Sequence, residues 1–450
     1  MSDPTSLDAL SHALLDHARA AGAEAADVMA LRGTSQGVDV RAGALEQAER
    51  SEAVDIGLRV LIGQKVATVS ASDVSEGTMQ MMAERAVAMA LEAPDDPYSG
   101  LADPDQLARD VNMARLELAD PTPEPGAEAL KARALEAEAA ALGVEGVTQV
   151  SGASAYASTR EVFLAATNGF SAGYTRTDHG HNCVAIAGTG LGMERDYDGD
   201  GRAHLADLRP PSEIGAQAGQ RAVARLDARK PPTGTFPVLF DERVASSLIG
   251  HLLAAINGQA VARGASFLRD AVGEAVLPDG LDLSEKPHRP RVSGSRLFDG
   301  EGLATAQRKI VEGGVLTGLI LDLASARKLG MTPTANAARG VGSGPGPSAG
   351  NMTLTQGSAT RADLIRDMGT GLLVTSMIGS TINPNTGDYS RGAAGHWVEN
   401  GEIAYPVNEC TIAGNLKDML RAIVPANDAR THLSRVVASL LVPGMTVAGN

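Results

Sequence analysis

The residues whose types and spacing most resemble a binding motif belong to a short Asp/Gly-rich segment. Asp196, Asp198 and Asp200 alternate with other residues, Gly201 follows them, and Asp207 is the twelfth residue of the segment. Calcium loops of the EF-hand type use carboxylates at this spacing, with a glycine at the sixth position. The segment lacks flanking helical patterns and a final glutamate, and Asp and Gly are also common in tight turns. We therefore interpret it as a turn, with a calcium site as the alternative.

A second candidate is the alternating trio His179, His181 and Cys183. On a strand all three would point to one face, and imidazole and thiolate are zinc ligands. Same-face neighbours on one strand lie about 6.5 Å apart, however, which is too far for all three to reach one ion. The sequence therefore favours a solvent-facing histidine pair beside a half-buried cysteine, with a metal site as the alternative.

Other chemical motifs are weak or missing. Gly188, Gly190 and Gly192 follow an apolar run, but the spacing lacks the third glycine of a dinucleotide-binding loop and no helical pattern follows. The sequence contains no H-E-x-x-H, C-x-x-C or Walker A motif. Residue types and spacing alone therefore supply no catalytic constellation.

The elements around these residues predict an α+β fold. Short alternating apolar runs punctuated by glycine over residues 26–70 predict an antiparallel β-meander, because the connections are too short for parallel crossovers. Apolar periodicity predicts flanking helices. The C-terminal part predicts a mainly antiparallel, β-rich domain with one long helix and a hairpin at Asn400-Gly401. The predicted helices span residues 5–21, 75–91, 127–142, 211–228 and 241–262.

At 450 residues the chain exceeds the usual size of one core, so we expect more than one domain. The proline-rich stretch 92–126 reads as a surface linker, and the Lys-Pro-Pro-Thr-Gly run at 230–234 as a boundary. The predicted domains are 1–110, 111–230 and 231–450. The glycine-rich stretch 339–351 predicts a mobile loop.

Composition excludes several functional classes. The formal net charge of −15, without a basic cluster, argues against a nucleic-acid partner. No apolar run approaches the ~20 residues of a membrane-spanning helix, and the first residues lack a signal-peptide pattern. Only two cysteines occur, Cys183 and Cys410, which suits a reducing compartment. We therefore expect a cytoplasmic protein without a membrane partner.

Three blocks of the C-terminal half carry a family resemblance. They are NPNTGDYSRG at 383–392, the stretch 395–405 and VNECTIAGNLKDM at 407–419. Together they resemble the closing signature of the TldD/PmbA family. Residues 54–70 with the helix after them are similar to the N-terminal domain of that family, and residues 179–214 resemble its PmbA (TldE) branch.

The resemblance implies a metal site in one branch and its loss in this chain. TldD subunits carry His-Glu-x-x-x-His at the start of a helix directly after a strand, and a later cysteine completes the metal site. Here Asp241 and Ser246 stand in place of the two histidines, and Glu242 in place of the glutamate. The stretch 433–450 contains no cysteine, and Cys410 does not match the liganding one. Asp241 instead suits the N-cap of a helix.

The resemblance thus implies a non-catalytic, metal-free subunit that pairs with a TldD-type catalytic subunit carrying zinc. This chain would complete a chamber for unfolded peptides, which edge strands near residues 397–405 could hold by β-augmentation. We expect a homodimer when the chain is alone. Two alternatives remain open: a metallopeptidase that uses Asp241, Glu242 and His179 or His181, and a self-associating peptide-binding protein.

Overall fold

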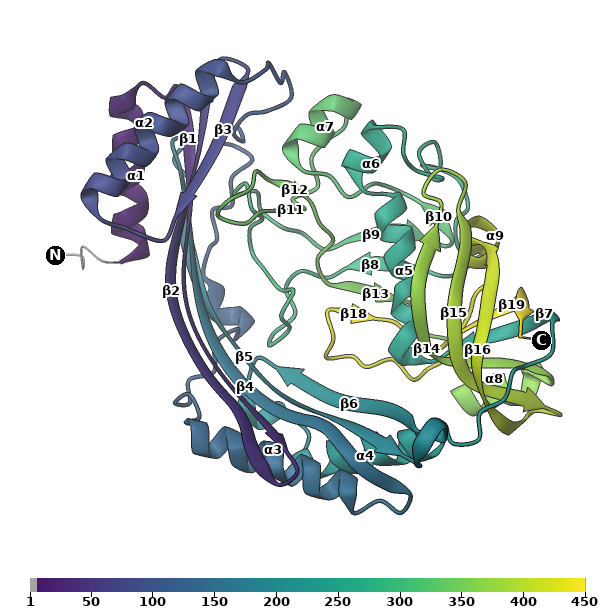
Figure 1. The fold of residues 1–450 in the computed structure, drawn as a ribbon. Coiled ribbons are helices and arrows are strands. Elements are labelled where there is room, and N and C mark those ends of the chain that lie inside the picture. Colours follow the sequence, from purple (N-terminus) through teal and green to yellow (C-terminus); the bar gives the residue numbers. More distant parts are fainter. Residues whose placement is uncertain (1–5, 450) are drawn as a thin grey trace.

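The computed structural model describes residues 6–449. Figure 1 shows two parts: a long, curved sheet with helices on its outer face, and a β-rich part that faces its concave side. The predicted α+β class is confirmed, and the sheets are mainly antiparallel. Within the described residues, no helix is both long and apolar enough to cross a membrane.

The curved sheet has six antiparallel strands in the order β3-β2-β1-β4-β5-β6. It contains the predicted meander, but the strands are much longer than the short apolar runs suggested, and the sheet continues past residue 110. The strands are β1 (Ala25–Arg41), β2 (Ala44–Ile62), β3 (Lys65–Ala71), β4 (Val147–Ala166), β5 (Ser171–Ala187) and β6 (Glu194–Arg202).

Four helices cover the convex face in two pairs (Figure 1). One pair is α1 (Leu7–Ala21) and α2 (Glu76–Glu92), and the other is α3 (Ala127–Leu142) and α4 (Pro211–Val223). Each pair closes its own aliphatic core against the sheet. A Cβ at Gly215 would lie 1.9 Å from the carbonyl oxygen of Ala137, so α3 and α4 pack closely only because this residue is glycine. The helices predicted at 75–91 and 127–142 are confirmed to within one residue. The helix predicted at 211–228 is shorter, because α4 ends at Val223. Residue 5 of the helix predicted at 5–21 lies outside the described residues.

The segment between α2 and α3 joins the two parts of the molecule. It contains the short 3₁₀ helix η1 (Met113–Leu116), and Leu116 and Leu118 are buried against the loop that holds Phe298. The amide of Ala108 donates to the carbonyl of Gly302 at 2.9 Å. The predicted surface linker is thus partly buried between the sheet and the C-terminal part. Two further 3₁₀ helices are η2 (Gly190–Gly192) and η3 (Leu205–Asp207).

The C-terminal part is built on a mostly antiparallel sheet in the order β16-β15-β14-β7-β19-β17. β16 also pairs with β19, which closes the sheet on itself, and β7 and β14 are parallel. At the β15–β16 turn, Asn400 and Gly401 have positive φ values of 55° and 78°, so the predicted hairpin is confirmed. The strands are β7 (Gly234–Phe240), β14 (Gly371–Ile382), β15 (Asp388–Glu399), β16 (Glu402–Asn415), β17 (Val424–Pro425) and β19 (Leu440–Ala448).

The helix predicted over residues 241–262 is two helices, α5 (Glu242–Ala255) and α6 (Gly258–Ala262). The break comes at Asn257, whose backbone is extended and whose side chain accepts from the amides of Gln259 and Ala260. A second N-cap therefore starts a new helix where apolar periodicity suggested continuation. α5 presents Leu248, Ile249 and Leu252 to the main C-terminal core.

Smaller elements complete the face toward the curved sheet. A five-stranded sheet has the order β10-β9-β8-β13-β18, and β11 pairs with β12. The glycine-rich stretch predicted to be mobile includes β12 and begins at Arg339, which reaches Asp27 on β1. The remaining elements of the C-terminal part, some of which lie away from the curved sheet, are β8 (Leu283–Glu285), β9 (Arg308–Glu312), β10 (Val315–Leu316), β11 (Ala337–Ala338), β12 (Gly346–Pro347), β13 (Met352–Leu354), β18 (Arg435–Val436), α7 (Leu323–Leu329), α8 (Arg361–Met368) and α9 (Leu416–Arg421).

Candidate functional site

The corner between β7 and α5 holds the residues that replace a metal-binding motif. Asp241 follows the strand directly and caps α5, and its carboxylate accepts from the amide of Arg243 at 3.2 Å. The same carboxylate pairs with the guanidinium of Arg243 at 3.3 Å and with Arg361. Its side chain is only 4% exposed. Both carboxylate oxygens of Asp241 are therefore engaged by donors of the chain itself.

Glu242, one residue further, is also paired. Its Oε2 accepts from Arg430 Nε at 2.7 Å. Burial raises the pKa of Glu242, and Asp241 adds to the rise while Arg430 opposes it. Ser246 lies half-buried one turn along α5. The corner thus presents a capping aspartate, an arginine-bound glutamate and a neutral hydroxyl.

This donor set does not fit a catalytic metal. Such a site needs about three protein ligands and an open position, and Ser246 offers only a neutral hydroxyl. A carboxylate bound by arginine would have to give up that partner to coordinate a cation. Between residues 6 and 449, no group of three or more His, Cys, Asp or Glu residues is arranged to hold a metal ion.

The aspartates of the Asp/Gly-rich segment lie on β6, so their interpretation as a turn is wrong. The β5–β6 connection is made by the residues just before them. Alternation with period two places Asp196, Asp198 and Asp200 on one face, where all three are buried. Each is bound by arginine: Asp196 by Arg243 at 3.0 Å, Asp198 by Arg209 at 2.9 Å and Arg221 at 2.8 Å, and Asp200 by Arg202 at 3.0 Å. The aspartates form an ion-pair ladder and not an oxygen cage open to calcium.

His179 and His181 lie on β5 and face the helices α3 and α4, with Cys183 in the core of that layer. The prediction of a solvent-facing pair is wrong, because both histidines are buried under the loops and helices that cover the convex face. Burial lowers the pKa of each, which favours the neutral rings. His179 Nε2 lies 3.6 Å from Asp120 Oδ2. Burial also raises the pKa of Cys183 to about 12, so this thiol stays protonated and is a poor ligand.

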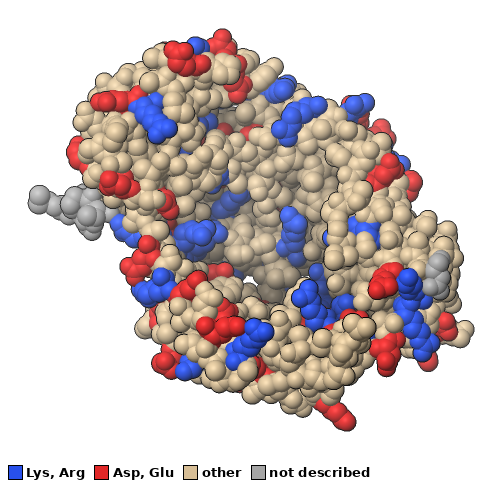
Figure 2. Space-filling view, in the orientation of Figure 1, with Lys and Arg blue, Asp and Glu red and all other residues tan. Residues whose placement is uncertain are grey.

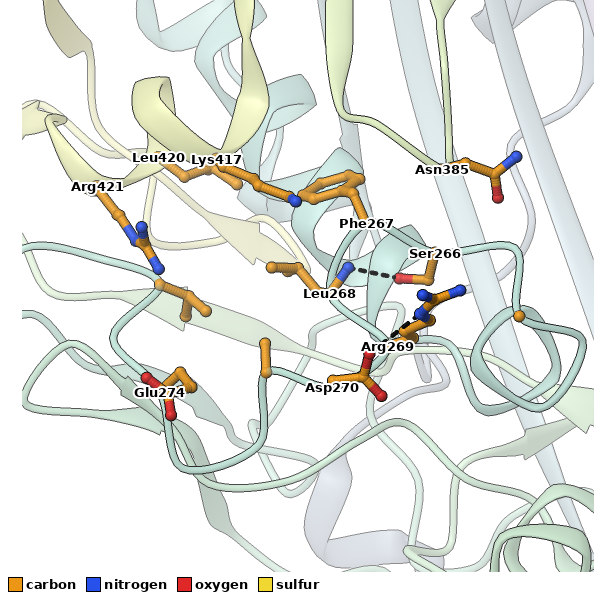
Figure 3. Close-up of a pocket in the computed structure, with 13 residues that line it drawn as sticks. Ser266, Phe267, Leu268, Arg269, Asp270, Glu274, Asn385, Lys417, Leu420 and Arg421 are labelled. Atoms are coloured by element: carbon orange, nitrogen blue, oxygen red, sulfur yellow. Dashed lines mark hydrogen bonds and ion pairs between the residues drawn. The ribbon is translucent and has the colours of Figure 1, made fainter.

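Among the hollows on the described surface, two lie against strands and helices of the C-terminal part. Figure 3 shows one of 630 Å³ between the stretch after α6 and helix α9, where Arg269 pairs with Asp270 at 3.0 Å and Lys417 and Arg421 come from the opposite wall. A second, of 530 Å³, lies between β6 and the strands β14 and β15, with Tyr197 and Ile378 at its walls. The second hollow faces strand segments that have a neighbour on one side only.

Sequence reasoning missed the arginines that neutralise the corner. Arg361 and Arg430 lie more than one hundred residues from their acidic partners along the chain. Arg243, which joins Asp241 to Asp196, is close to one partner and distant from the other. No local pattern pairs such residues, and only the packing of β6 against the β7–α5 corner reveals the network.

Comparison with known proteins identifies the class to which this fold and corner belong. Family models described as PmbA/TldA metallopeptidase domain 1, central domain and C-terminal domain match residues 26–90, 120–226 and 233–449. The chain therefore belongs to the PmbA/TldA metallopeptidase family, and the family prediction is confirmed.

Within the family, the chain is 37% identical over 428 residues to the Metalloprotease PmbA of Escherichia coli O157:H7, covering 95% of this chain and 92% of that protein. Its fold matches a crystal structure from Bacteroides thetaiotaomicron, titled as a candidate modulator of DNA gyrase, with a TM-score of 0.91, 25% identity and 98% of both chains covered. TldE from Thermococcus kodakarensis, at 18% identity, shares the fold with a TM-score of 0.84 over 97% of this chain and all of that one.

Proposed function

We propose that this chain is the metal-free, non-catalytic subunit of a TldD/TldE-type peptidase. The observation that carries the proposal is the β7–α5 corner, where Asp241 and Glu242 are each bound by arginine and Ser246 offers a neutral hydroxyl. Water bound to no metal has a pKa far too high to supply hydroxide at neutral pH. An arginine-bound Glu242 therefore has no activated water to serve.

We infer that the partner is a TldD-type subunit, which would carry zinc and the hydrolytic chemistry. The support is the family assignment together with the shape of the molecule. Figure 2 shows the face between the curved sheet and the C-terminal part hollowed, with basic side chains gathered around it. A second subunit facing this hollow would close it into a chamber. In this proposal the substrate that enters the chamber is an extended, unfolded peptide.

In this proposal the chain shapes the chamber and positions the peptide. The 530 Å³ hollow beside β6 and β14 offers strand edges that could pair with a peptide backbone. The strand edge at the hairpin 397–405 is less open where it continues along β16, because the carbonyl of Pro406 accepts from the amide of Arg229. Without its partner the chain would cover the same face with a second copy of itself, as a homodimer in the cytoplasm.

The test is to measure peptide hydrolysis and bound metal for the purified chain alone, for a TldD-type partner alone and for the mixture. The proposal predicts no stoichiometric zinc and no cleavage by this chain alone, and chelator-sensitive cleavage by the mixture. Chelator-sensitive cleavage by this chain alone would overturn it in favour of a self-sufficient metallopeptidase. Binding of peptide without cleavage in the mixture would favour a peptide-binding protein instead.

A further inference from the structure

A cavity of 130 Å³ lies at the seam between the concave face of the curved sheet and the C-terminal part. Met29, Val162, Leu164 and Tyr174 supply its wall from β1, β4 and β5. These side chains point away from the helix-covered face, whose core contains Val28, Ala165 and their neighbours. Phe298 closes the other side and packs edge-on against Tyr174 with ring centres 5.9 Å apart. The cavity therefore has aromatic and aliphatic walls on these sides.

Arginines with unused donors lie at or beside this apolar cavity. Throughout the described residues, the buried guanidinium N–H groups that lack an acceptor belong to three residues, Arg176, Arg296 and Arg339. Arg296 and Arg339 line the cavity. Arg176 stacks over the ring of Tyr174, with 5.0 Å between its guanidinium carbon and the ring centre. Buried donors without acceptors are rare in proteins, so their gathering at one place calls for an explanation.

The acids nearby do not satisfy these donors. One carboxylate oxygen of Asp27 accepts from Arg59 Nε at 2.9 Å, and the other oxygen accepts from one terminal nitrogen of Arg339. The Nε and the second terminal nitrogen of Arg339 therefore have no hydrogen-bond partner. The side chain of Arg339 is fully buried, so a ligand in the cavity cannot reach these N–H groups, and Arg339 contributes only positive charge behind the wall. Asp299 also lines the cavity, but its oxygens already accept from the amides of Glu301 at 2.9 Å, Leu303 at 3.0 Å and Ala337 at 2.9 Å.

Arg296 is also held without a carboxylate. Its two terminal nitrogens donate to the carbonyls of Ala337 and Ser348 at 3.5 and 3.3 Å, distances that make weak bonds, and its Nε has no acceptor. The planar guanidinium group can donate two parallel hydrogen bonds to one carboxylate. A bound carboxylate would therefore replace the two weak bonds to backbone carbonyls by stronger, charge-assisted ones.

We propose that this cavity binds a peptide carboxylate, with the terminal nitrogens of Arg296 as the donors and the aromatic and aliphatic wall around the adjoining carbons. The volume equals that of about four water molecules, which suits a carboxylate with a short apolar side chain. The carboxylate can come from the C-terminus of a peptide or from an acidic side chain. The inference rests on the proposed function, in which a peptide is held between the curved sheet and the C-terminal part.

Calorimetric titration of the full-length chain tests the site directly. Three probes separate the two sources: acetyl-Gly-Gly-Val with a free C-terminus, the same peptide as its amide, and acetyl-Gly-Glu-Gly amide. The free acid or the glutamate peptide should bind at least tenfold more tightly than the uncharged amide, and the better of the two identifies the source. Equal affinity for all three, or no binding by any, would overturn the proposal.

Two variants locate the binding. Arg296→Gln removes a donor that makes only weak bonds in the free chain and should weaken binding of the preferred acid about tenfold. Val162→Phe fills the cavity and should abolish the preference for a carboxylate. The control is Arg269→Gln, at the hollow of Figure 3, which should bind like the parent chain. Unchanged binding by both cavity variants, with thermal melting showing that they fold, would overturn the assignment.

The outcome is separable from that of the proposed function. Binding is measured on this chain alone, whereas the proposed function is measured as cleavage by the mixture with a TldD-type partner. Loss of the carboxylate preference with intact cleavage removes the cavity site only. Intact preference with cleavage by this chain alone removes the non-catalytic assignment only.

Discussion

The β7–α5 corner and the seam cavity are both rich in arginine, and they differ in how the charges are satisfied. At the corner each acid accepts from arginine, and Asp241 accepts from two. At the seam Arg296 and Arg339 keep buried N–H groups without an acceptor. Acids and arginines that satisfy one another leave no donor for a ligand, whereas the terminal nitrogens of Arg296, which line a cavity and make only weak bonds, can take a carboxylate from outside. The difference separates a corner whose charges serve the structure from a cavity that we propose binds a ligand.

The largest effect is expected at the corner. Asp241→Ala removes the N-cap of α5 and leaves the buried Arg243 and its neighbour Arg361 without this partner, so the free energy of unfolding should fall by about 3 kcal/mol. Ser246→Ala, one turn along the same helix, is the control and should change it by less than about 0.5 kcal/mol. Urea denaturation measures both. A loss below about 1 kcal/mol for Asp241→Ala would show that the corner does not hold the fold together.

Glu301, which lies two residues from Asp299 of the seam cavity, should make the free energy of unfolding depend on pH. Burial raises the pKa of Glu301 to about 8, and Asp299 adds to the rise. The folded chain therefore holds a proton that the unfolded chain releases near pH 4.5, so stability should fall as pH rises through this window. The slope is at most about 1.4 kcal/mol per pH unit. Urea denaturation between pH 5 and 8 should show a flatter profile for Glu301→Gln; an identical profile would contradict a protonated Glu301.

The smallest effect is expected from metal ions. Because Asp196, Asp198 and Asp200 are all bound by arginine, millimolar Ca²⁺ or micromolar Zn²⁺ should leave the melting temperature of this chain unchanged. Chelator should leave it unchanged too. Differential scanning fluorimetry checks both. A rise in melting temperature that saturates with Ca²⁺, and that disappears in Asp198→Asn, would restore a cation site on β6.

Much of the fold could be predicted from local patterns. Helix α3 has the predicted bounds, and Asn400-Gly401 makes the predicted turn because both residues accept positive φ. The helix predicted through Asn257 failed because a capping side chain outweighs apolar periodicity there. The aspartates of β6 look like a turn in the sequence, because Asp and Gly favour turns. They form a strand because they pair with β5, and arginines of distant segments neutralise their buried carboxylates.

The candidate sites also differ in how far they could be predicted from the sequence. The replaced motif at Asp241, Glu242 and Ser246 is visible in the sequence by its resemblance to a metal-binding one. The burial of His179 and His181 could not be predicted from the sequence, because α3, α4 and the loops that cover these histidines are distant from them along the chain. The seam cavity has no local signature at all: Tyr174, Arg296 and Arg339 are brought together only when the C-terminal part faces the concave side of the sheet.

The most direct test of the central claim is Glu242→Gln, measured as peptide turnover by the assembled complex with a TldD-type subunit. The amide still accepts from Arg430, so the variant should fold and assemble, as co-elution with the partner would verify. We predict a kcat within about twofold of the parent complex, because Glu242 serves no water in our account. A loss of about one hundredfold or more, the effect of removing a general base, would show that this glutamate takes part in catalysis.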